Sequence, residues 1–301
     1  MTRQAIIDIG SNSLKMYVGR VVHGRVTEVA DMAVVNRLAE GLAGSGELSE
    51  TAMDRTLVAI KEFKSHAEGL GAEKIAAVGT QALRQADNAK EFVTWIRNRC
   101  KIGVRVLSGA EEARLAFLAA TSSLDLGDDP VQVFDAGGAS TEVVQGIDGR
   151  IDESCSLPVG SRVLTDRHLL SDPVTVAELA ELSDALRRVI ETVPGRSGKL
   201  VGIGATAVSL GTVHYGVGWE DHAAVHGRTV SRRVVGDAIS RLREMPLRDR
   251  RRIPGLHPQR ADVMLAGASI VVALMSRLGA EEMIICDRGL RHGVFHDRFM
   301  S

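Results

Sequence analysis

A short polar turn that occurs twice, each time directly after an apolar strand pattern, constrains this chain most. The first copy reads Asp8-Ile9-Gly10-Ser11-Asn12-Ser13 and the second reads Asp135-Ala136-Gly137-Gly138-Ala139-Ser140-Thr141. The second aspartate follows the first by 127 residues (135 − 8), and Gly204 follows Gly79, which ends an equivalent strand pattern, by 125 (204 − 79). Such similar spacing across separate elements indicates an internal duplication. We therefore expect two lobes with the same topology.

Strand and helix patterns alternate through both copies, which is typical of the α/β fold class. In the first copy, the sequence predicts strands at 5–9, 15–22, 25–35, 74–79 and 103–107. It also predicts one helix that begins at 49, a second that ends near 100 and a third at 109–121. After a polar linker, it predicts strands at 131–135, 142–147, 150–157, 199–203 and 282–286. The helices predicted for this part are at about 176–189, at 231–244, at 260–277 and at about 288–298, with one more that begins near 205. We expect a first lobe at 1–125 and a second lobe at 126–287, with the last helix (about 288–301) packing on the first lobe.

The composition excludes several classes of protein. With 45% hydrophobic and 25% charged residues the chain is typical of a globular protein, and no apolar stretch approaches the roughly 20 residues that span a bilayer. The strand pattern at Ala5 leaves no room for a signal peptide, so we expect a cytoplasmic protein without membrane contact. A formal net charge of −1 gives no general attraction for nucleic acid. Cys100, Cys155 and Cys286 lack CxxC spacing and are interpreted as buried structural residues.

Both polar turns have the residue types that bind phosphate. Glycines let the backbone approach an anion closely, while amide N–H groups and hydroxyls donate to phosphate oxygens. Asp8 and Asp135 then remain available to hold a cation, and Mg²⁺ (or Mn²⁺) prefers one or two carboxylates together with phosphate oxygens. A single turn of this kind is usually structural, but its duplication favours an enzyme that acts on a phosphate chain.

Seven blocks along the chain resemble the exopolyphosphatase and guanosine pentaphosphate phosphohydrolase (Ppx/GppA) family of the actin-like superfamily. The blocks are residues 7–13, 80–86, 108–114, 135–142, 157–161, 202–206 and 287–291. The resemblance covers the whole chain. It implies two ribonuclease-H-like lobes, an active-site cleft between them, and hydrolysis of phosphoanhydride bonds.

The resemblance also implies roles for individual polar residues. Hydrolysis needs an oriented water and stabilisation of the charge on the transferred phosphoryl group. The glutamate directly before Ala113 and Arg114 has the base role in the family, which selects Glu112 over Glu111. Arg84 is expected to clamp phosphate oxygens, because a guanidinium binds them bidentately and stays charged. The expected phosphate-binding residues are Gly10, Ser11, Asn12, Ser13, Thr80, Gly137, Gly138, Ala139, Ser140, Thr141, Gly204, Ala205 and Thr206.

Several residues depart from the family pattern or have two interpretations. Ala139 and Ala205 stand where the family usually has glycine, and alanine tolerates positive φ and close backbone approach less well. His292 replaces an acidic residue and is interpreted as a surface variant. Lys15 is expected to point to the same side of its strand as Ser13. It is interpreted either as a substrate contact or as a solvated lysine. The arginine-rich stretch at 248–252 is either a guide for a polyanion or a solvated helix face balanced by nearby acids.

The leading expectation is a Mg²⁺-dependent exopolyphosphatase that removes terminal phosphate from inorganic polyphosphate, with guanosine pentaphosphate (pppGpp) as a further substrate. Longer family members carry additional C-terminal domains, so a preference for short polyphosphate chains is expected. A homodimer is expected by analogy alone. Two alternatives stay open: an ATP-dependent kinase or ATPase of the same superfamily, and a non-catalytic regulator that binds polyphosphate or the guanosine alarmones pppGpp and ppGpp.

Overall fold

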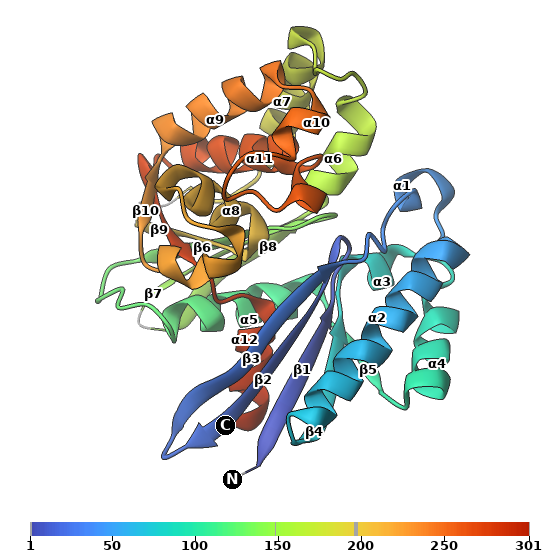
Figure 1. Ribbon diagram of the computed structural model, residues 1–301. Helices are drawn as coiled ribbons and strands as arrows, with labels where there is room; N and C mark the ends of the chain where they lie inside the picture. The colour runs from blue at the N-terminus through green and yellow to red at the C-terminus, as the bar shows by residue number, and fades with distance from the viewer. Residues whose placement is uncertain (1, 148, 196–197, 301) are drawn as a thin grey trace. The chain divides into compact units, whose positions relative to one another are not determined.

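Two mixed β-sheets, one in each half of the chain, organise the structure, a computed structural model that describes residues 2–147, 149–195 and 198–300 (Figure 1). Unit 1 consists of Met1–Leu115 and Leu290–Ser301, and unit 2 of Ala116–Gly289. The chain leaves unit 1 inside helix α5 (Gly109–Thr121), whereas the sequence suggests a boundary after residue 125. The α/β fold class is confirmed.

Unit 1 contains a five-stranded sheet with the order β3-β2-β1-β4-β5. The first three strands form an antiparallel meander, and β4 and β5 run parallel to β1. The strands are β1 (Arg3–Ile9), β2 (Ser13–Val22), β3 (Arg25–Val35), β4 (Ala72–Gly79) and β5 (Val104–Val106). The helices, besides the first part of α5, are α1 (Leu42–Ser45), α2 (Glu50–Gly69), α3 (Gln81–Gln85), α4 (Ala89–Cys100) and α12 (Leu290–Phe299).

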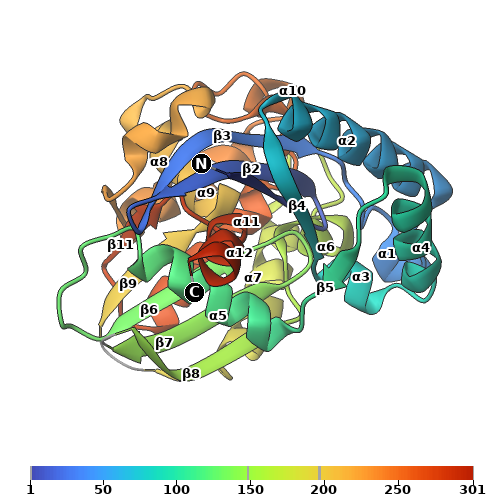
Figure 2. The ribbon, with the colours of Figure 1, turned by 90° about the horizontal axis from the view of Figure 1, so that it is seen from below.

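Alternation along β1 gives the sheet of unit 1 two apolar faces. Ala5, Ile7 and Ile9 are buried in a cluster with residues of α2 and α4, whereas Ile6 is buried in a second cluster with residues of α12. Figures 1 and 2 show α2 and α4 on one side of the sheet and α12 on the other. Because side chains alternate along a strand, Asp8 lies on the same face as Ile6. The predicted packing of the last helix on this sheet agrees with the clusters.

Unit 2 contains a six-stranded sheet with the order β10-β11-β9-β6-β7-β8. The strands are β6 (Val131–Ala136), β7 (Thr141–Ile147), β8 (Arg150–Leu157), β9 (Lys199–Ile203), β10 (Thr229–Ser231) and β11 (Glu282–Cys286). The α-helices are α6 (Ser161–His168), α7 (Val176–Ile190), α8 (Gly204–Tyr215), α9 (Arg232–Glu244), α10 (Leu247–Arg250) and α11 (Met264–Arg277), and two 3-10 helices are η1 (Trp219–Val225) and η2 (Pro258–Arg260).

The main core of unit 2 lies on one face of this sheet. Phe134 and Ala136 of β6 are buried there together with residues of α7, α8, α9 and the fully buried side of α11. On the other face, the second half of α5 approaches β7 so closely that a Cβ atom on Gly146 would lie 2.7 Å from the Phe117 ring. Asp135 alternates with Phe134 and Ala136, so its side chain is on the α5 face.

Strand register confirms the internal duplication. Asp8 is paired with Lys15 on β2 and with Val78 on β4. Asp135 is paired with Glu142 on β7 and with Ile203 on β9. Both aspartates therefore sit at the same place in a shared strand order. The spacings of 127 and 125 residues that the sequence shows correspond to these pairings.

A few local predictions differ from the structure. The short elements α1, α6, α10 and β10 are absent from the sequence prediction. Val176, expected on the apolar stripe of α7, is 68% exposed at the first residue of that helix. Cys100 and Cys286 are buried as expected, whereas Cys155 is only half-buried. Among the described residues, every helix is too short or too polar to cross a membrane.

Candidate functional site

The two polar turns, named loop 1 (residues 10–13) and loop 2 (residues 137–141), share one backbone hydrogen bond. Gly10 N–H donates to Ser13 O at 3.2 Å, and Gly137 N–H donates to Ser140 O at 2.9 Å. A Cβ atom would lie 2.7 Å from that oxygen at Gly10 and 3.0 Å from it at Gly137. A larger residue at either glycine would force the turn open. The duplication thus extends to the geometry of the loops.

Loop 1 is held by the segment that follows β3. The amides of Asn36 and Arg37 both donate to Asn12 O at 3.1 Å, and the amide of Ala39 donates to Ser11 O at 2.9 Å. The N–H and C=O groups of one trans peptide point in opposite directions. The N–H groups of the Ser11–Asn12 and Asn12–Ser13 peptides therefore point away from this segment.

Loop 2 is held in the same way by the first turn of α6. Ser161 N–H donates to Gly137 O at 2.8 Å, and Arg162 N–H donates to Gly138 O at 2.8 Å. Gly160 lies so close that a Cβ atom there would be 2.4 Å from the Ala139 nitrogen. The same peptide geometry turns the N–H groups of Gly138 and Ala139 away from α6.

Asp8 is a buried carboxylate with unused bonding capacity. It is 3% exposed, and its Oδ2 lies 4.0 Å from Lys15 Nζ. Within the described part of the chain, Asp8 Oδ1 and both polar side-chain atoms of Asn12 are buried without a hydrogen-bond partner. Burial raises the pKa of Asp8, and the charges of Lys15 and Arg291 offset part of that effect. A buried carboxylate oxygen of this kind beside a phosphate-binding turn fits a divalent cation, whose charge favours the ionised form.

Asp135 of unit 2 lies against the glycine that begins α8. Gly204 has φ +77°, and a Cβ atom there would lie 2.3 Å from Asp135 Oδ1. Glu142, directly across from Asp135 on β7, is 4% exposed and accepts a hydrogen bond from Ser156 Oγ at 2.9 Å. Its counterpart in unit 1 is Lys15, so the two copies differ in charge at this position. Glu142 was not among the residues predicted for the site, although its place directly after loop 2 on a strand could have indicated it.

Arg84 and Glu112 are brought together in unit 1. Arg84, near the end of α3, donates to the Glu112 carboxylate and, at 2.6 Å, to Leu107 O. Its Nε also donates to Gln81 Oε1 at 3.1 Å. Glu112 in the first turn of α5 is 6% exposed. The residue predicted to clamp phosphate and the residue predicted to activate water are therefore direct partners.

The neighbouring Glu111 has a structural role instead. Its carboxylate accepts from Ser108 N–H at 2.8 Å and from Ser108 Oγ at 2.9 Å, while its own N–H donates to Ser108 Oγ at 3.2 Å. This reciprocal pair is a capping box at the start of α5. The hydrogen bonds from Ser108 lower the pKa of Glu111 to about 2. Two adjacent glutamates thus differ in environment: one caps a helix and the other contacts an arginine.

Three predicted hydroxyl donors have partners inside the protein. Thr80 Oγ1 donates to Ile9 O at 3.5 Å, Thr206 Oγ1 to Ala136 O at 2.9 Å and Thr141 Oγ1 to Val159 O at 2.7 Å. The first two acceptors are equivalent positions of the duplication, 127 residues apart (136 − 9). These hydroxyls tie the loops to their strands.

Neither alanine substitution conflicts with the local backbone. Positive φ occurs at Gly204 but at neither Ala139 nor Ala205, within the described residues. Ala205 is the second residue of α8, where alanine is the most favourable residue. Loop 2 and the start of α8 therefore keep their fold without the extra glycines.

Unit 2 has a buried cationic cluster that sequence reasoning missed. Arg162 Nη2 pairs with Asp262 at 2.6 Å, and Arg162 Nη1 pairs with Asp166 at 3.1 Å. Arg260 is close enough to Asp135 and Asp262 to be influenced by both charges, and burial lowers its pKa to about 10. Arg162 N–H also binds loop 2, so the cluster adjoins that loop. Residues 162 and 262 are far apart in sequence, which is why no local pattern indicated them.

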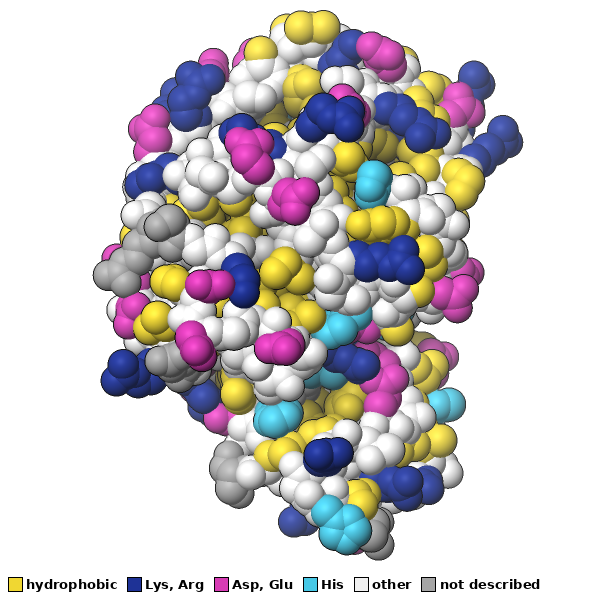
Figure 3. All heavy atoms as spheres, turned by 90° about the vertical axis from the view of Figure 1, so that its left-hand side faces the viewer, with side chains coloured by type: hydrophobic (Ala, Val, Ile, Leu, Met, Phe, Trp, Pro, Cys, Tyr) yellow, Lys and Arg dark blue, Asp and Glu magenta, His cyan; other side chains and the backbone are white. Residues whose placement is uncertain are grey.

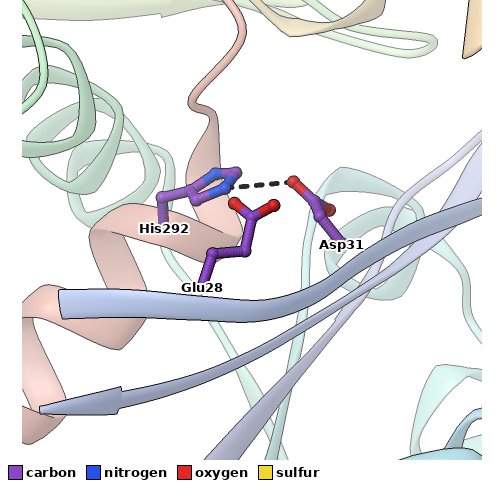
Figure 4. Close-up of side chains that lie close together, drawn as sticks. All are labelled: Glu28, Asp31 and His292. Carbon is purple, nitrogen blue, oxygen red and sulfur yellow. Dashed lines mark ion pairs between the residues drawn. The ribbon is translucent and has the colours of Figure 1, made fainter. Parts of the chain in front are cut away.

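His292 is a buried partner of Asp31, so its interpretation as a surface variant was wrong. Its Nε2 lies 3.1 Å from Asp31 Oδ2, and its ring centroid lies 4.5 Å from that of Tyr17. Figure 4 shows Glu28, Asp31 and His292 converging from β3 and α12, close enough to hold a metal ion. Both Asp31 oxygens already accept from the Arg291 guanidinium at 2.6 Å, and this charge lowers the pKa of Asp31. We therefore interpret the cluster as an ion-pair network that anchors α12 to the sheet.

The arginine-rich stretch is not a uniformly solvated helix face, because Arg250 is buried. Arg250 is 4% exposed, and its Nε donates to Leu242 O at 2.7 Å and to Met245 O at 3.0 Å. It therefore closes the end of α9 and is unavailable to a polyanion. Arg243 pairs with Glu244 at 2.8 Å and Arg248 with Asp249 at 3.7 Å. On the face drawn in Figure 3, basic side chains are likewise interspersed with acidic ones.

Comparisons with known proteins agree with this arrangement. Residues 17–301 match the sequence profile described as the Ppx/GppA phosphatase family. The chain is 29% identical to Exopolyphosphatase 2 of Mycobacterium tuberculosis, over 98% of each chain. It is 31% identical to the guanosine-5'-triphosphate,3'-diphosphate pyrophosphatase of Photobacterium profundum, over 97% of this chain and 58% of that relative.

A solved structure gives the same result for the fold. The Aquifex aeolicus member of the Ppx/GppA protein family superimposes with a TM-score of 0.84, at 30% identity, over 98% of this chain and 97% of that one. The two-lobed actin-like fold that the sequence predicts is thereby confirmed.

Proposed function

The chain belongs to the Ppx/GppA phosphatase family, and we propose that it hydrolyses the terminal phosphoanhydride bond of inorganic polyphosphate, with guanosine pentaphosphate as a second substrate. The observation that carries this proposal is the contact between Arg84 and Glu112. A carboxylate that orients water and a guanidinium that binds a phosphoryl group are the two parts that phosphoanhydride hydrolysis requires of a protein.

Backbone amides bind phosphate groups of the substrate in this proposal. The N–H groups of each loop are suited to phosphate oxygens, because they add donors without needing side-chain movement. Asn12, whose buried amide group has no hydrogen-bond partner among the described residues, adds a further donor. Arg260, beside Asp135, adds a positive charge in unit 2.

The reaction step uses Arg84 and Glu112 together. The oxygen of a water held by Glu112 attacks the terminal phosphorus, the water proton passes to the Glu112 carboxylate, and the bond to the bridging oxygen breaks. The shortened chain leaves with the electrons of that bond. Before this step, the incoming phosphate competes with Glu112 for the Arg84 guanidinium. Substrate binding thereby releases the carboxylate as a base only when a phosphoryl group is present to be attacked.

A divalent cation, Mg²⁺ or Mn²⁺, is part of the proposal. Asp8 in unit 1 and Asp135 in unit 2 are the residues proposed as ligands of such ions, and the buried Oδ1 of Asp8, without a hydrogen-bond partner among the described residues, supports this role. Such an ion would neutralise charge on the phosphate oxygens and orient them. Glu142, on the same face as Asp135, supplies a further carboxylate for the ion or for one of its waters.

The test is phosphate release from polyphosphate, guanosine pentaphosphate and ATP, measured side by side with Mg²⁺ and with chelator. We expect release from polyphosphate with Mg²⁺ and none with chelator. Faster release from ATP than from polyphosphate would favour the kinase or ATPase alternative. Tight polyphosphate binding without any release would favour a non-catalytic regulator. A series of polyphosphate lengths in the same assay tests the expected preference for short chains.

A further inference from the structure

Thr56 interrupts the apolar face of helix α2. Met53 and Leu57 are buried on that face, and Thr56, between them, is fully buried as well. Its hydroxyl donates to Ala52 O at 2.7 Å and accepts from Asn36 Nδ2 at 3.1 Å. A polar residue at a core position is unfavourable unless it is hydrogen-bonded, and departures from a local pattern are expected at functional positions. The partner of Thr56 therefore indicates what α2 holds at this point.

That partner belongs to residues 36–39, the segment that contacts loop 1. Arg55, the residue before Thr56 in α2, holds the backbone of the same segment. Its Nε donates to Asn36 O at 2.6 Å, and its Nη2 donates to Arg37 O at 3.2 Å. Asn36 itself is 1% exposed, and α2 bonds both its side chain and its backbone. Two adjacent residues of α2 thus fix the start of the segment.

One peptide group connects Arg55 to loop 1. The C=O group of the peptide between Asn36 and Arg37 accepts from Arg55, and the N–H group of the same peptide donates to Asn12 O at 3.1 Å. These two groups point in opposite directions, so the guanidinium, the peptide and the loop 1 carbonyl form a chain of hydrogen bonds. Bonds in such a chain polarise and strengthen one another, and a charged donor strengthens the first of them. Arg55 therefore reinforces the contact that holds Asn12.

An ion pair with Glu40 is the simpler explanation for Arg55, but it accounts for less of the geometry. Arg55 Nη2 lies 3.3 Å from Glu40 Oε2, and the two side chains are 40% and 50% exposed. Exposed ion pairs of this kind contribute little to stability. The shorter contact of Arg55 is the one with Asn36 O, and a planar guanidinium is suited to bonding two carbonyl groups at once.

We propose that Arg55 is a positioning residue, which holds residues 36–39 against loop 1 and so keeps the loop in the conformation that binds phosphate. This inference rests on the proposed hydrolase function and deepens it, because it assigns part of the substrate affinity to a residue that acts through the backbone. A loop that is already ordered avoids the entropic cost of ordering when substrate binds. Such a contribution is equal in bound substrate and transition state, so its loss should raise KM and leave kcat nearly unchanged.

The test removes the hydrogen-bond donors of Arg55 and keeps the helix. Arg55→Met retains an unbranched side chain with a similar helix propensity. We expect KM for polyphosphate to rise about tenfold, as for loss of one charge-assisted hydrogen bond, with kcat nearly unchanged. Arg55→Lys lacks the planar guanidinium and should have an intermediate KM. Steady-state kinetics are measured well below the Tm of each variant.

Two further variants serve as controls. Glu40→Gln removes the ion pair and keeps both carbonyl contacts of Arg55, so KM should not change. Ile96→Val removes a buried methyl group from the same core and should lower Tm. It lies in the second half of α4, which leads to the start of β5, at the opposite end of the parallel strands from loop 1. Its KM should also stay unchanged.

Two results would overturn the inference. An equal KM in Arg55→Met and Ile96→Val would leave Arg55 a structural role alone. A KM in Glu40→Gln as high as that in Arg55→Met would assign the effect to the ion pair.

The failure of the parent proposal is separable. Should the unaltered protein release no phosphate, tripolyphosphate binding is measured by titration calorimetry. Weaker binding by Arg55→Met than by Ile96→Val would still support the positioning role. Equal binding by the two variants, or no binding by the unaltered protein, would reject it.

Discussion

The Arg84 guanidinium and the Glu112 carboxylate are bonded to each other, although they belong to different helices, α3 and α5. Arg84 is also fixed by Gln81 and by the Leu107 carbonyl, so Glu112 meets an arginine that is already oriented. A carboxylate paired in this way is a weak base until another anion takes its partner. In the proposed mechanism, the pair ties the basicity of Glu112 to the presence of phosphate.

Glu112→Gln should abolish hydrolysis and keep substrate binding. The amide retains the shape of the side chain and can still accept from Arg84, but it cannot take a proton from water. We expect kcat to fall about 100- to 10,000-fold, the range for loss of a general base. Phosphate release and equilibrium binding of polyphosphate are measured on the same preparation.

Glu111→Gln is the control at the adjacent position. Its carboxylate caps α5, and its pKa of about 2 lies below the ordinary value near 4.5. Because the pKa of Glu111 is lower in the folded protein than in the unfolded chain, its ionised carboxylate stabilises the fold at pH values above about 4.5. The variant should therefore have a lower Tm at neutral pH, and the Tm difference should shrink as pH falls from about 4.5 toward 2. Its kcat should be near that of the unaltered protein. A large loss of kcat here would reverse the assignment of the two glutamates.

Asp8→Asn should stabilise the protein while it removes activity. The buried Oδ1 of Asp8 has no hydrogen-bond partner among the described residues, so the neutral amide avoids the desolvation of a charge. We expect an equal or higher Tm without divalent ions, loss of the Tm increase that Mg²⁺ gives the unaltered protein, and kcat lower by about 100-fold or more. A full Mg²⁺ response in the variant would exclude Asp8 as a ligand.

Asp31→Asn is the contrasting variant, because the Asp31 carboxylate is buried but accepts two hydrogen bonds from Arg291. Breaking this pair leaves a buried guanidinium and should lower the free energy of unfolding by about 3 kcal/mol. The Mg²⁺ response should be retained. Loss of that response would instead indicate a metal site at Glu28, Asp31 and His292.

Gly204→Ala should disturb Asp135 as well as the backbone. The φ of +77° alone costs about 1–2 kcal/mol for alanine, and the new Cβ would meet Asp135 Oδ1 at 2.3 Å. We expect a lower Tm together with a higher Mg²⁺ requirement. Gly236→Ala in α9 meets no atom within 4 Å and should raise stability by about 0.5–1 kcal/mol. Thermal unfolding and Mg²⁺ titration of both variants separate these effects.

His226→Gln should flatten the dependence of stability on pH. His226 Nδ1 lies 2.8 Å from Asp287 Oδ1, and Nε2 lies 3.1 Å from Ser123 O. The ion pair with Asp287 raises the pKa of His226 from 6.5 to about 10. Its contribution is therefore complete below pH 6.5 and is lost as pH rises through 10. The Tm difference between the two proteins should shrink over that window, and a constant difference would contradict the assignment.

Much of the fold follows from local sequence. The bounds predicted for β8, β9, β11 and α5 agree with the structure, because apolar alternation and helix periodicity are strong there. The register of Asp8 and Asp135 follows from the duplication. Helix α6 was missed because it is short, and two of its three buried residues are the polar Ser161 and Arg162. It packs through hydrogen bonds to loop 2 together with a single core residue, Leu164.

The residues alone indicated the site where one turn contains its chemistry, and the family resemblance added Arg84 and Glu112. Gly10 and Gly137 can be recognised in the sequence as turn residues, because a Cβ atom at either position would collide with the backbone of its own turn. The pairs Arg162 with Asp262 and Arg291 with Asp31 join residues 100 and 260 positions apart. No periodicity encodes such pairs. His292 was misjudged for the same reason, because its partner Asp31 lies on a strand at the other end of the chain.

The place of α12 has a consequence for synthesis on the ribosome. The face of sheet β3-β2-β1-β4-β5 that bears Ile6 and Tyr17 is covered by Leu290, Val294 and Phe295. Those three residues are translated after the whole of unit 2. The apolar face of the nascent unit 1 therefore stays uncovered until α12 has been synthesised, after the continuous segment that forms unit 2.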